Sequence, residues 1–307
     1  MVQTTDLPGK IFQFSAASMA AIALLMFFFI FVTAAPVVEK EGIGFITGTT
    51  WSYDTHQYGI YNFIAGTLAL TVVTMLLAVP LSIGTAIFLV EWAPAHVDRA
   101  VSTSIELLVG IPSVIFGIFG YFVLQPIFRL YVDPAVSATL GWIPIFHDND
   151  PSGGSSILLA SFVLAIMVLP TITALSREAM RSVPSEYREG SLALGATRWE
   201  TLRHVVLPAS MAGILTGIIL GLMRAMGETM AVVMLMGNVP HIPGSILDPA
   251  YAMTSKILND IGYNILDEES KSALFGIAAV LFLIEMALVA LLRGVISRYG
   301  APGGNAR

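Results

Sequence analysis

The sequence has no cysteine and few charges. Its 307 residues include no Cys, and Asp, Glu, Lys and Arg together make up only 12% of them. The missing thiols exclude a disulfide framework and a thiolate metal site. A soluble domain has about a quarter charged residues, so a soluble globular fold is not expected. The five histidines are scattered outside the apolar runs, and no cluster of His, Asp and Cys indicates a metal centre or an active site.

A nucleotide-binding motif is missing as well. The phosphate-loop pattern G-x-x-x-x-G-K-[ST] does not occur, and residues 195–199, GATRW, have neither its length nor its lysine. We therefore expect no ATP hydrolysis by the chain itself. We also expect no catalytic residues, no metal, no cofactor and no nucleic-acid partner.

Long apolar runs dominate what is present. Hydrophobic residues make up 56% of the chain, and the mean hydropathy is +0.80. A spanning helix needs about 20 mostly apolar residues, and its backbone must be satisfied within the segment. The sequence therefore predicts an all-α membrane protein with six transmembrane helices, at residues 11–38, 61–90, 101–128, 157–176, 209–236 and 272–292. The first run exceeds the roughly 7–15 apolar residues of a signal peptide, so we expect a retained helix.

Basic residues gather on one side of these predicted spans. If the N-terminus is inside, the inner segments hold Lys10, Arg99, Arg177, Arg181, Arg188, Arg198, Arg203, Arg293, Arg298 and Arg307. The outer segments hold only Lys40, Lys256 and Lys271, with Arg129 at a boundary. Cytoplasmic loops carry an excess of Lys and Arg, so both termini are predicted to be cytoplasmic.

The inner segment 177–208 contains prolines and glycines that divide it into short pieces. We expect two short helices, 185–194 and 198–206, with Gly195 in a tight turn between them. Pro208 would then begin the fifth span, where a missing N–H group is tolerated. An ordinary amphipathic surface loop would explain the arginines of this segment by topology alone.

Arg224 and Glu228 lie within the fifth apolar run. An ionisable residue at membrane depth is costly and marks a pathway or a pair. The i,i+4 spacing allows the two to pair along one face of a continuous helix. On a helical wheel they share that face with Gly213, Gly217 and Gly221, whose small size lets another helix approach closely. Two readings stay open, namely a pair that fixes helix register and an anion contact made by the arginine.

The third run contains Gly110-Ile111-Pro112-Ser113. Such a segment can unwind a helix and expose backbone groups to a cavity. Ser113 is therefore a further candidate for a translocation path together with Arg224 and Glu228. A plain proline kink is the alternative.

Three stretches resemble a known family, the C-type permease subunit of the bacterial high-affinity phosphate ABC importer. They are residues 42–71 (GIGFITGTTWSYDTHQYGIYNFIAGTLALT), residues 105–117 (IELLVGIPSVIFG) and residues 189–238. The third stretch begins EGSLALGATRWETLRHVVLP and ends RAMGETMAVVMLMGN. The order and spacing of residues 189–208 are similar to the loop that an ATPase subunit grips. On this resemblance the coupling residues are Glu189, Gly190, Gly195, Arg198, Leu207 and Pro208. Gly190 and Ser191 stand where the family usually has two alanines.

The resemblance implies the six-helix, type-I (MetI-like) importer fold. It divides the chain into three regions. Residues 1–60 hold the N-terminal tail, the first helix and an outer loop. Residues 61–296 form the transmembrane domain, with its coupling loop near 186–208, and residues 297–307 form a tail. It also implies a bacterial inner-membrane complex for inorganic phosphate. The expected partners are a sibling A-type permease, two ATPase subunits and an extracytoplasmic phosphate-binding protein, which we expect at the outer loops 51–58 and 241–263.

Two other functions stay open from the residues themselves. An ion-coupled secondary transporter for an anion could use Glu228 as its titrating group, but such a transporter needs no ATPase-docking loop. An importer permease for another oxyanion, such as sulfate or molybdate, would share the general architecture.

Overall fold

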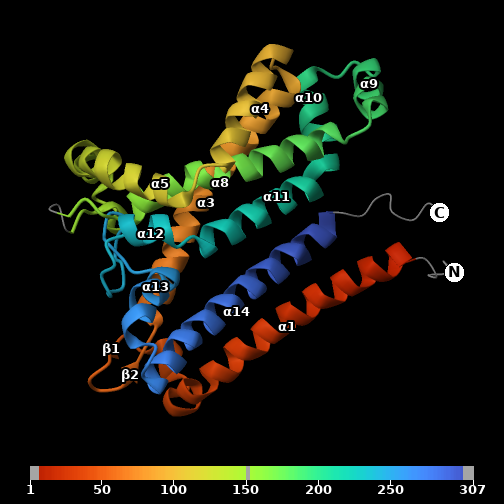
Figure 1. The fold of residues 1–307 in the computed structure, drawn as a ribbon. Helices are drawn as coiled ribbons and strands as arrows, with labels where there is room; N and C mark the ends of the chain where they lie inside the picture. The colour runs from red at the N-terminus through yellow and green to blue at the C-terminus, as the bar shows by residue number, and fades with distance from the viewer. Residues whose placement is uncertain (1–6, 150–152, 300–307) are drawn as a thin grey trace. The chain divides into compact units, whose positions relative to one another are not determined.

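A computed structural model describes residues 7–149 and 153–299 of the chain (Figure 1). Within these residues, six helical segments are long and apolar enough to cross a membrane. They are Gly9–Glu41, Tyr61–Glu91, Ser113–Leu140, Ile157–Arg181, Arg198–Gly227 and Glu268–Gly294. The prediction of an all-α protein with six spanning helices is confirmed.

The helices divide into two compact units. The N-terminal unit comprises Met1–Tyr61 with Ile257–Phe282, and the core unit comprises Asn62–Lys256 with Leu283–Arg307. The long helices α13 (Met253–Asn264) and α14 (Glu268–Tyr299) contribute residues to both units.

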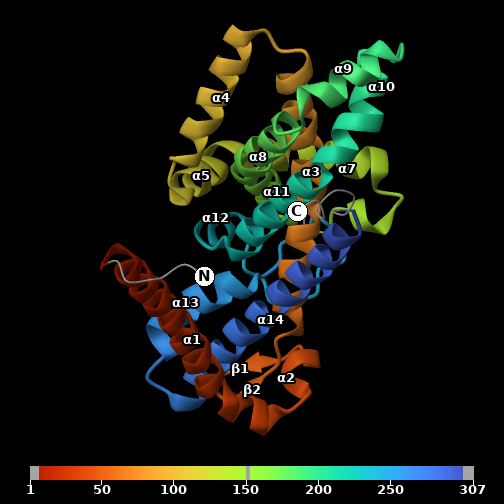
Figure 2. The ribbon, with the colours of Figure 1, turned by 90° about the vertical axis from the view of Figure 1, so that its right-hand side faces the viewer.

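The N-terminal unit is built on α1 (Leu7–Glu41), whose apolar side chains are mostly exposed, as expected of a lipid-facing helix. Its last turns pack against the first half of α14, where Phe29 and Phe275 meet edge to face at 5.5 Å. The backbone N–H of Val37 donates to Ser272 Oγ at 3.0 Å. A short helix, α2 (Gly44–Thr47), and an antiparallel hairpin follow; its strands are β1 (Trp51–Ser52) and β2 (Gln57–Tyr58) (Figure 2).

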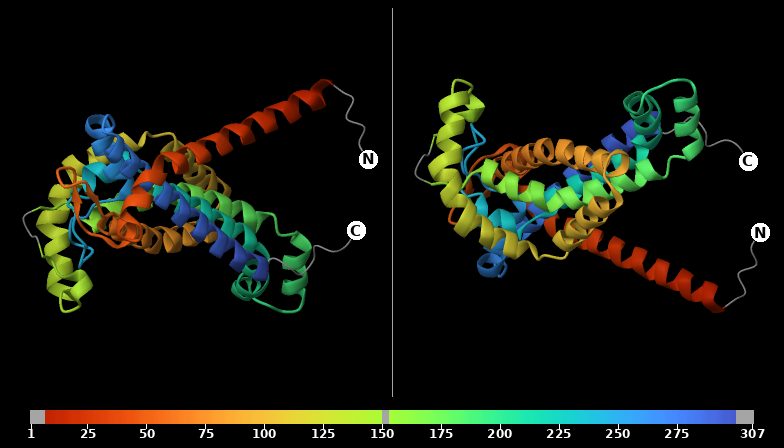
Figure 3. Two further views of the ribbon diagram at one scale, coloured as in Figure 1. Left: turned by 90° about the horizontal axis from the view of Figure 1, so that it is seen from below. Right: turned by 90° about the horizontal axis from the view of Figure 1, so that it is seen from above.

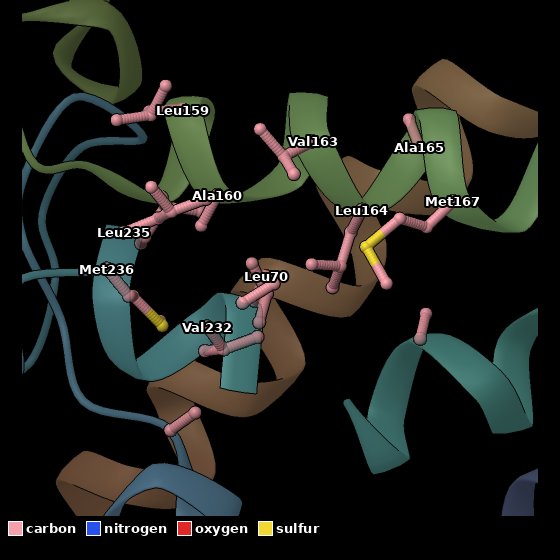
Figure 4. Close-up of a cluster of buried hydrophobic side chains, with 14 of the residues drawn as sticks. Leu70, Leu159, Ala160, Val163, Leu164, Ala165, Met167, Val232, Leu235 and Met236 are labelled. Atoms are coloured by element: carbon pink, nitrogen blue, oxygen red, sulfur yellow. The ribbon is translucent and has the colours of Figure 1, made fainter. Parts of the chain in front are cut away.

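The core unit is built around α8 (Ile157–Arg181). In the apolar 18-residue stretch of this helix, 67% of the residues are buried. The helix lies beside α11 (Leu207–Gly227) along its length (Figure 3). The other neighbours are α3 (Tyr61–Glu91), α4 (Ala95–Val109), α5 (Ser113–Phe119) and α12 (Met230–Leu235). In the apolar core, Leu70 of α3, Leu164 of α8 and Val232 of α12 lie close together (Figure 4).

Four buried hydroxyl groups of α3 and α8 donate to backbone carbonyls. Thr67 and Thr71 donate to the carbonyls four residues earlier in α3, at 2.8 and 2.7 Å. Ser161 of α8 donates across to the carbonyl of Leu70 at 3.2 Å, and Thr173 donates to that of Ser82 at 3.3 Å. The bonds of Ser161 and Thr173 therefore join α8 to α3.

The third span differs from its predicted position at 101–128. Helix α4 ends at Val109, the chain is irregular from Gly110 to Pro112, and a new helix begins at Ser113. The helix is therefore interrupted, and the proline-kink alternative is wrong. The physical reason is that a proline disfavours the helical conformation of the residue before it and cannot donate a helical hydrogen bond.

Three π-helical turns precede prolines within longer helices. They are η1 (Gly120–Leu124), η2 (Phe128–Val132) and η4 (Leu202–Val206). Two residues after each turn stands a proline, namely Pro126, Pro134 and Pro208. In each case the residue before the proline donates to the carbonyl five positions back. The wider turn lets the helix continue past a residue that cannot donate.

These turns join shorter elements into two of the spans. The third span consists of α5, η1, α6 (Gln125–Ile127), η2 and α7 (Asp133–Leu140), and a 3-10 turn, η3 (Pro144–Phe146), follows it. The fifth span consists of α10 (Arg198–Thr201), η4 and α11. The expectation that Pro208 begins the fifth span is therefore wrong, because the helix starts ten residues earlier at Arg198.

Candidate functional site

The loop between the fourth and fifth spans folds as two helices joined by a glycine turn. Helix α9 covers Ser185–Ala193, and α10 begins at Arg198. Gly195 lies between them with a φ of +87°, a left-handed conformation that side chains disfavour. The first predicted helix and the glycine turn are confirmed, but the second helix, predicted at 198–206, continues without a break to Gly227.

A capping box fixes the start of α10. The N–H of Thr197 donates to Glu200 Oε2 at 2.7 Å, and the N–H of Glu200 donates to Thr197 Oγ1 at 3.3 Å. The Thr-x-x-Glu pattern at the start of a helix is the sequence signal for this arrangement, and it was available in the sequence. The cap at Thr197, two residues after Gly195, gives α10 a defined beginning.

Polar contacts tie α9 to the rest of the core unit. Arg188 of α9 forms an ion pair with Glu91, the last residue of α3, and also donates to the carbonyl of Met180 at 3.0 Å. The hydroxyls of Ser191 and Thr201 are 2.9 Å apart. Sequence spacing gives no hint of these partners, because the Arg188–Glu91 pair joins residues 97 positions apart.

A second ion cluster lies at the C-terminal end of α8. Arg177 and Arg181 both contact the Asp98 carboxylate of α4, at 2.8 and 3.0 Å. The side chains of Arg177 and Asp98 are about one-fifth exposed. These two arginines therefore hold α4 against α8.

The surface of this loop is exposed and partly apolar. Glu189, Gly190 and Arg198 are all exposed, and a Cβ atom added at Gly190 or Gly195 would meet no atom within 4 Å. Leu194, next to Gly195, is 92% exposed. Tyr187 and Trp199 are also exposed, and Trp199 stacks loosely on Trp92 with ring centroids 6.3 Å apart.

Leu207 and Pro208 lie apart from that exposed face. They follow η4 within the continuous helix of the fifth span, where Leu207 is half-buried and Pro208 is exposed. The sequence-predicted coupling residues are thus divided between the loop surface and the helix behind it. The sequence analysis did not identify Tyr187 and Leu194 as exposed apolar residues of this loop. An apolar residue next to a turn glycine could have indicated one.

The glycines of α11 lie against α8. A Cβ atom added at Gly213 would be 2.4 Å from the Cβ of Ala179, and one at Gly221 would be 2.6 Å from Ile172 Cγ1. At Gly217 the nearest atom would be the Cβ of Leu175, at 3.1 Å. The three small residues permit a helix–helix approach that a larger side chain would prevent.

The fifth span ends before Glu228. Helix α11 stops at Gly227, Glu228 has extended backbone angles, and α12 starts at Met230. The prediction of one helix over 209–236 is therefore wrong. Arg224, half-buried in the last turn of α11, forms no ion pair with Glu228 or with any other described residue. Its cation instead lies at the negative end of the helix dipole.

Glu228 has local partners of its own. Its Oε1 accepts from the N–H of Ala231 at 3.3 Å, which caps α12, and its carbonyl accepts from Thr254 Oγ1 at 2.9 Å. Sequence reasoning missed Thr254, because nothing in its spacing relates it to residue 228. The expected i,i+4 pair requires a continuous helix, and the break in the chain removes that geometry.

The break at Ser113 lies level with the break at Glu228. A Cβ atom at Gly117 would be 3.2 Å from the Cα of Ala231, and one at Gly120 would be 2.8 Å from the side chain of Leu235. Helices α5 and α12 therefore run side by side in the same direction (Figure 1). It follows that their N-terminal ends, at Ser113 and Met230, lie at the same level of the core unit.

Comparison with known proteins identifies the family. Residues 78–299 match the family described as binding-protein-dependent transport system inner membrane component. The chain belongs to this family. It is 38% identical over 270 residues to the phosphate transport system permease protein PstC of Xylella fastidiosa strain 9a5c, covering 87% of this chain and 83% of that protein. It is 34% identical over 303 residues to PstC 2 of Mycobacterium tuberculosis, covering 94% and 92%.

Solved structures of permease complexes show the same fold. An inward-facing MetNI methionine ABC transporter matches with a TM-score of 0.53 at 19% identity, over 77% of this chain and 95% of that one. A bacterial alginate ABC transporter bound to its periplasmic protein matches with a TM-score of 0.56 at 17% identity, over 97% and 99%. The permease therefore has the MetI-like importer fold.

Family membership settles the general class of the protein. It is a multi-pass inner-membrane subunit of an ABC importer, and it is not itself catalytic. Permeases of this family work with an ATPase and with a binding protein outside the membrane.

Proposed function

We propose that this permease is the C-type membrane subunit of an ATP-driven importer of inorganic phosphate. The observation that carries the proposal is the similarity to PstC proteins over more than four-fifths of both chains. The exposed loop around Gly195 supports the ATP-driven part, because it offers a defined apolar surface at a glycine turn. A transporter driven by an ion gradient has no use for such a surface.

The coupling loop, near residues 186–208, would be the element that the ATPase moves. Helix α9 is joined to α3 through the Arg188–Glu91 pair, and α10 is continuous with the fifth span. A displacement of α9 therefore acts on two spans at once. In this proposal Glu189, Gly190, Gly195 and Arg198 face the ATPase, and Leu207 and Pro208 lie where the motion enters the membrane.

The translocation path would pass the two helix breaks. Arg224 carries a charge with no carboxylate partner among the described residues, and its planar guanidinium matches the oxygens of a phosphate ion. Ser113 and Glu228 lie at the breaks, which in this proposal expose polar backbone groups at membrane depth. Gly213, Gly217 and Gly221 would keep the fifth span close to α8.

The assembly would contain a sibling A-type permease, two ATPase subunits and a phosphate-binding protein. Both termini of this chain would lie in the cytoplasm, on the side of the basic coupling loop. The binding protein would then dock on the outer loops 51–58 and 241–263. The transmembrane domain would comprise residues 61–296, between an N-terminal segment, 1–60, and a tail, 297–307.

Reconstituted transport tests this function. The permease, its sibling, the ATPase and the binding protein are placed in vesicles, and uptake of labelled phosphate is followed with and without ATP. We expect ATP-dependent uptake that excess sulfate or molybdate does not inhibit. Uptake driven by a proton or sodium gradient without the ATPase would instead indicate a secondary transporter. Inhibition by sulfate or molybdate would reassign the substrate.

A further inference from the structure

A groove lined by both polar and apolar residues lies on the third span, away from the helix breaks. Its volume is about 360 Å³, and its lining includes Tyr121, Gln125, Arg129 and Gly153. The first three recur every four residues and therefore follow one side of the helix. Arg129 is 16 positions beyond Ser113, which corresponds to roughly 24 Å along a helix axis. The groove is thus separate from the path proposed at Ser113 and Glu228.

Arg129 is held in place through its aliphatic stem. The backbone of Gly154, at a φ of +69°, lies so close that an added Cβ atom would be 2.9 Å from the Arg129 Cβ and 3.4 Å from its Cγ and Cδ. Gln125 fixes the same loop, because its Nε2 donates to the carbonyl of Gly153 at 3.2 Å and to Ser155 Oγ at 2.9 Å. The groove therefore has a defined wall on either side of the arginine.

The charge of Arg129 has no counterpart among the described residues. No carboxylate there forms an ion pair with it. Asp133, four residues further along, is only 5% exposed and does not contact the guanidinium. Two lysines predicted on the outer side do have acidic partners. Lys40 pairs with Glu269, and Lys271 pairs with Glu268.

We propose that this groove binds a phosphate-type oxyanion, with the Arg129 guanidinium as its charged contact and the Tyr121 hydroxyl as a second donor. A guanidinium presents several N–H groups in a planar fork, and a phosphate group offers oxygens in matching positions. Tyr121 is 43% exposed, so its hydroxyl is accessible to an anion in the groove. The same chemistry fits inorganic phosphate and the phosphate of a lipid headgroup.

Binding to the purified full-length permease tests the proposal in two arms. In detergent free of phospholipid, binding of inorganic phosphate is measured by calorimetry. In a second arm, retained phosphatidylglycerol is counted by native mass spectrometry. Arg129→Gln removes the charge and leaves a shorter polar side chain, and Arg129→Lys keeps the charge without the fork. Tyr121→Phe removes only the hydroxyl, and Arg293→Gln is the control, because this exposed arginine lies on α14 outside the groove.

We expect Arg129→Gln to weaken one of the two bindings roughly tenfold, the scale of one charge-assisted hydrogen bond. Arg129→Lys and Tyr121→Phe should weaken it by less, and Arg293→Gln should leave it unchanged. A loss in the phosphate arm assigns the site to free phosphate, and a loss in the lipid arm assigns it to a headgroup. Unchanged binding of both ligands by a folded Arg129→Gln variant overturns the proposal. Neither arm involves ATP or uptake, so the result is independent of the proposed transport function.

Discussion

Arg188 of α9 pairs with Glu91, the residue at which α3 ends. The side chains are 23% and 15% exposed, so the pair is partly shielded from water. It connects the exposed coupling loop to a spanning helix that precedes it by almost a hundred residues. A force on α9 therefore reaches α3 through two side chains as well as through the chain itself.

Breaking this pair should uncouple transport from ATP hydrolysis. Arg188→Ala leaves the Glu91 carboxylate without its partner, a loss of about 1–3 kcal/mol for a buried group and less for one that keeps some solvent. We expect the permease to insert and assemble, but to import severalfold less phosphate per ATP hydrolysed. The ratio of labelled phosphate taken up to ATP consumed measures the effect. Arg293→Ala serves as the control, because Arg293 is exposed on α14, outside the coupling loop, and forms no ion pair within the described residues. An unchanged ratio in Arg188→Ala would contradict this role of the pair.

Gly195 should not tolerate a side chain. At a φ of +87°, an L residue is strained by roughly 1–2 kcal/mol, and a β-branched residue by more. We expect Gly195→Val to insert normally but to lose stimulation of the ATPase, because the turn that presents Leu194 is distorted. Gly84→Ala is the matched control, since Gly84 lies within α3 and a Cβ atom there meets nothing within 4 Å. Normal stimulation and uptake in Gly195→Val would show that the turn geometry is unimportant.

Packing between α8 and α11 should be sensitive at Gly221. A Cβ atom there would lie 2.6 Å from Ile172 Cγ1, so Gly221→Ala should destabilise the fold by about 1–3 kcal/mol, the usual cost of overpacking. Thermal unfolding in detergent measures the change. Adding Ile172→Ala removes the side chain that the new methyl group meets. The double variant should therefore lose less stability than the sum of the two single changes, and strict additivity would exclude the contact.

Acid should weaken the start of α14 through Asp267. This carboxylate accepts from the N–H of Ser270 at 2.8 Å and from its hydroxyl, and these hydrogen bonds lower the pKa of Asp267 below its ordinary value. The folded state therefore gains stability from the charged form. That gain is complete above the usual Asp pKa of about 4 and is lost as the pH falls through the lowered folded value. The unfolding temperature of the wild type should drop more steeply below pH 4 than that of Asp267→Asn. Parallel curves would exclude this contribution.

The sequence predicted the spans better than their interruptions. Apolar runs located all six helices, because hydropathy reports the length of chain that lipid accepts. Hydropathy does not register backbone geometry, so the breaks at Gly110–Pro112 and Glu228 shifted the ends of two spans. Pro208 was assigned to a helix start by the usual rule, whereas a π-helical turn carries the helix past it. The residues at Gly110–Pro112 did allow an unwound helix as one of two readings. The π-helical turn before Pro208 and the end of α11 depend on which carbonyl each N–H reaches, and a residue pattern does not contain that information.

The candidate site shows the same division between local and distant information. The glycine turn at Gly195 and the stripe in α11 follow from spacing along the chain. The partners of Arg188 and Glu228 come from other elements, namely Glu91 of α3 and Thr254 of α13. Tertiary packing chooses such partners, and the i,i+4 rule that predicted an Arg224–Glu228 pair holds only while the helix continues.

Replacement of Arg224 should impair transport without disrupting assembly. Arg224→Lys keeps the charge but loses the planar fork, so uptake should fall severalfold. Arg224→Ala removes the charge, and uptake should fall at least about tenfold. Because Glu228 is not its ion-pair partner, the alanine variant leaves no newly unpaired carboxylate. Labelled phosphate uptake and the yield of assembled complex are the two measurements, and a collapse of the yield in Arg224→Ala would show that the arginine is mainly structural.

The double variant Arg224→Ala with Glu228→Ala separates the two readings of these residues. If they formed a buried pair that only fixed the helix, removing both charges should restore assembly and uptake. In the structure Glu228 caps α12 through the N–H of Ala231, so its loss should cost an additional amount of about 1 kcal/mol, typical of a cap. We therefore expect the double variant to transport no better than Arg224→Ala and to be slightly less stable. Recovered phosphate uptake in the double variant would end the assignment of Arg224 to the anion path, because transport would then proceed with no cation at that position.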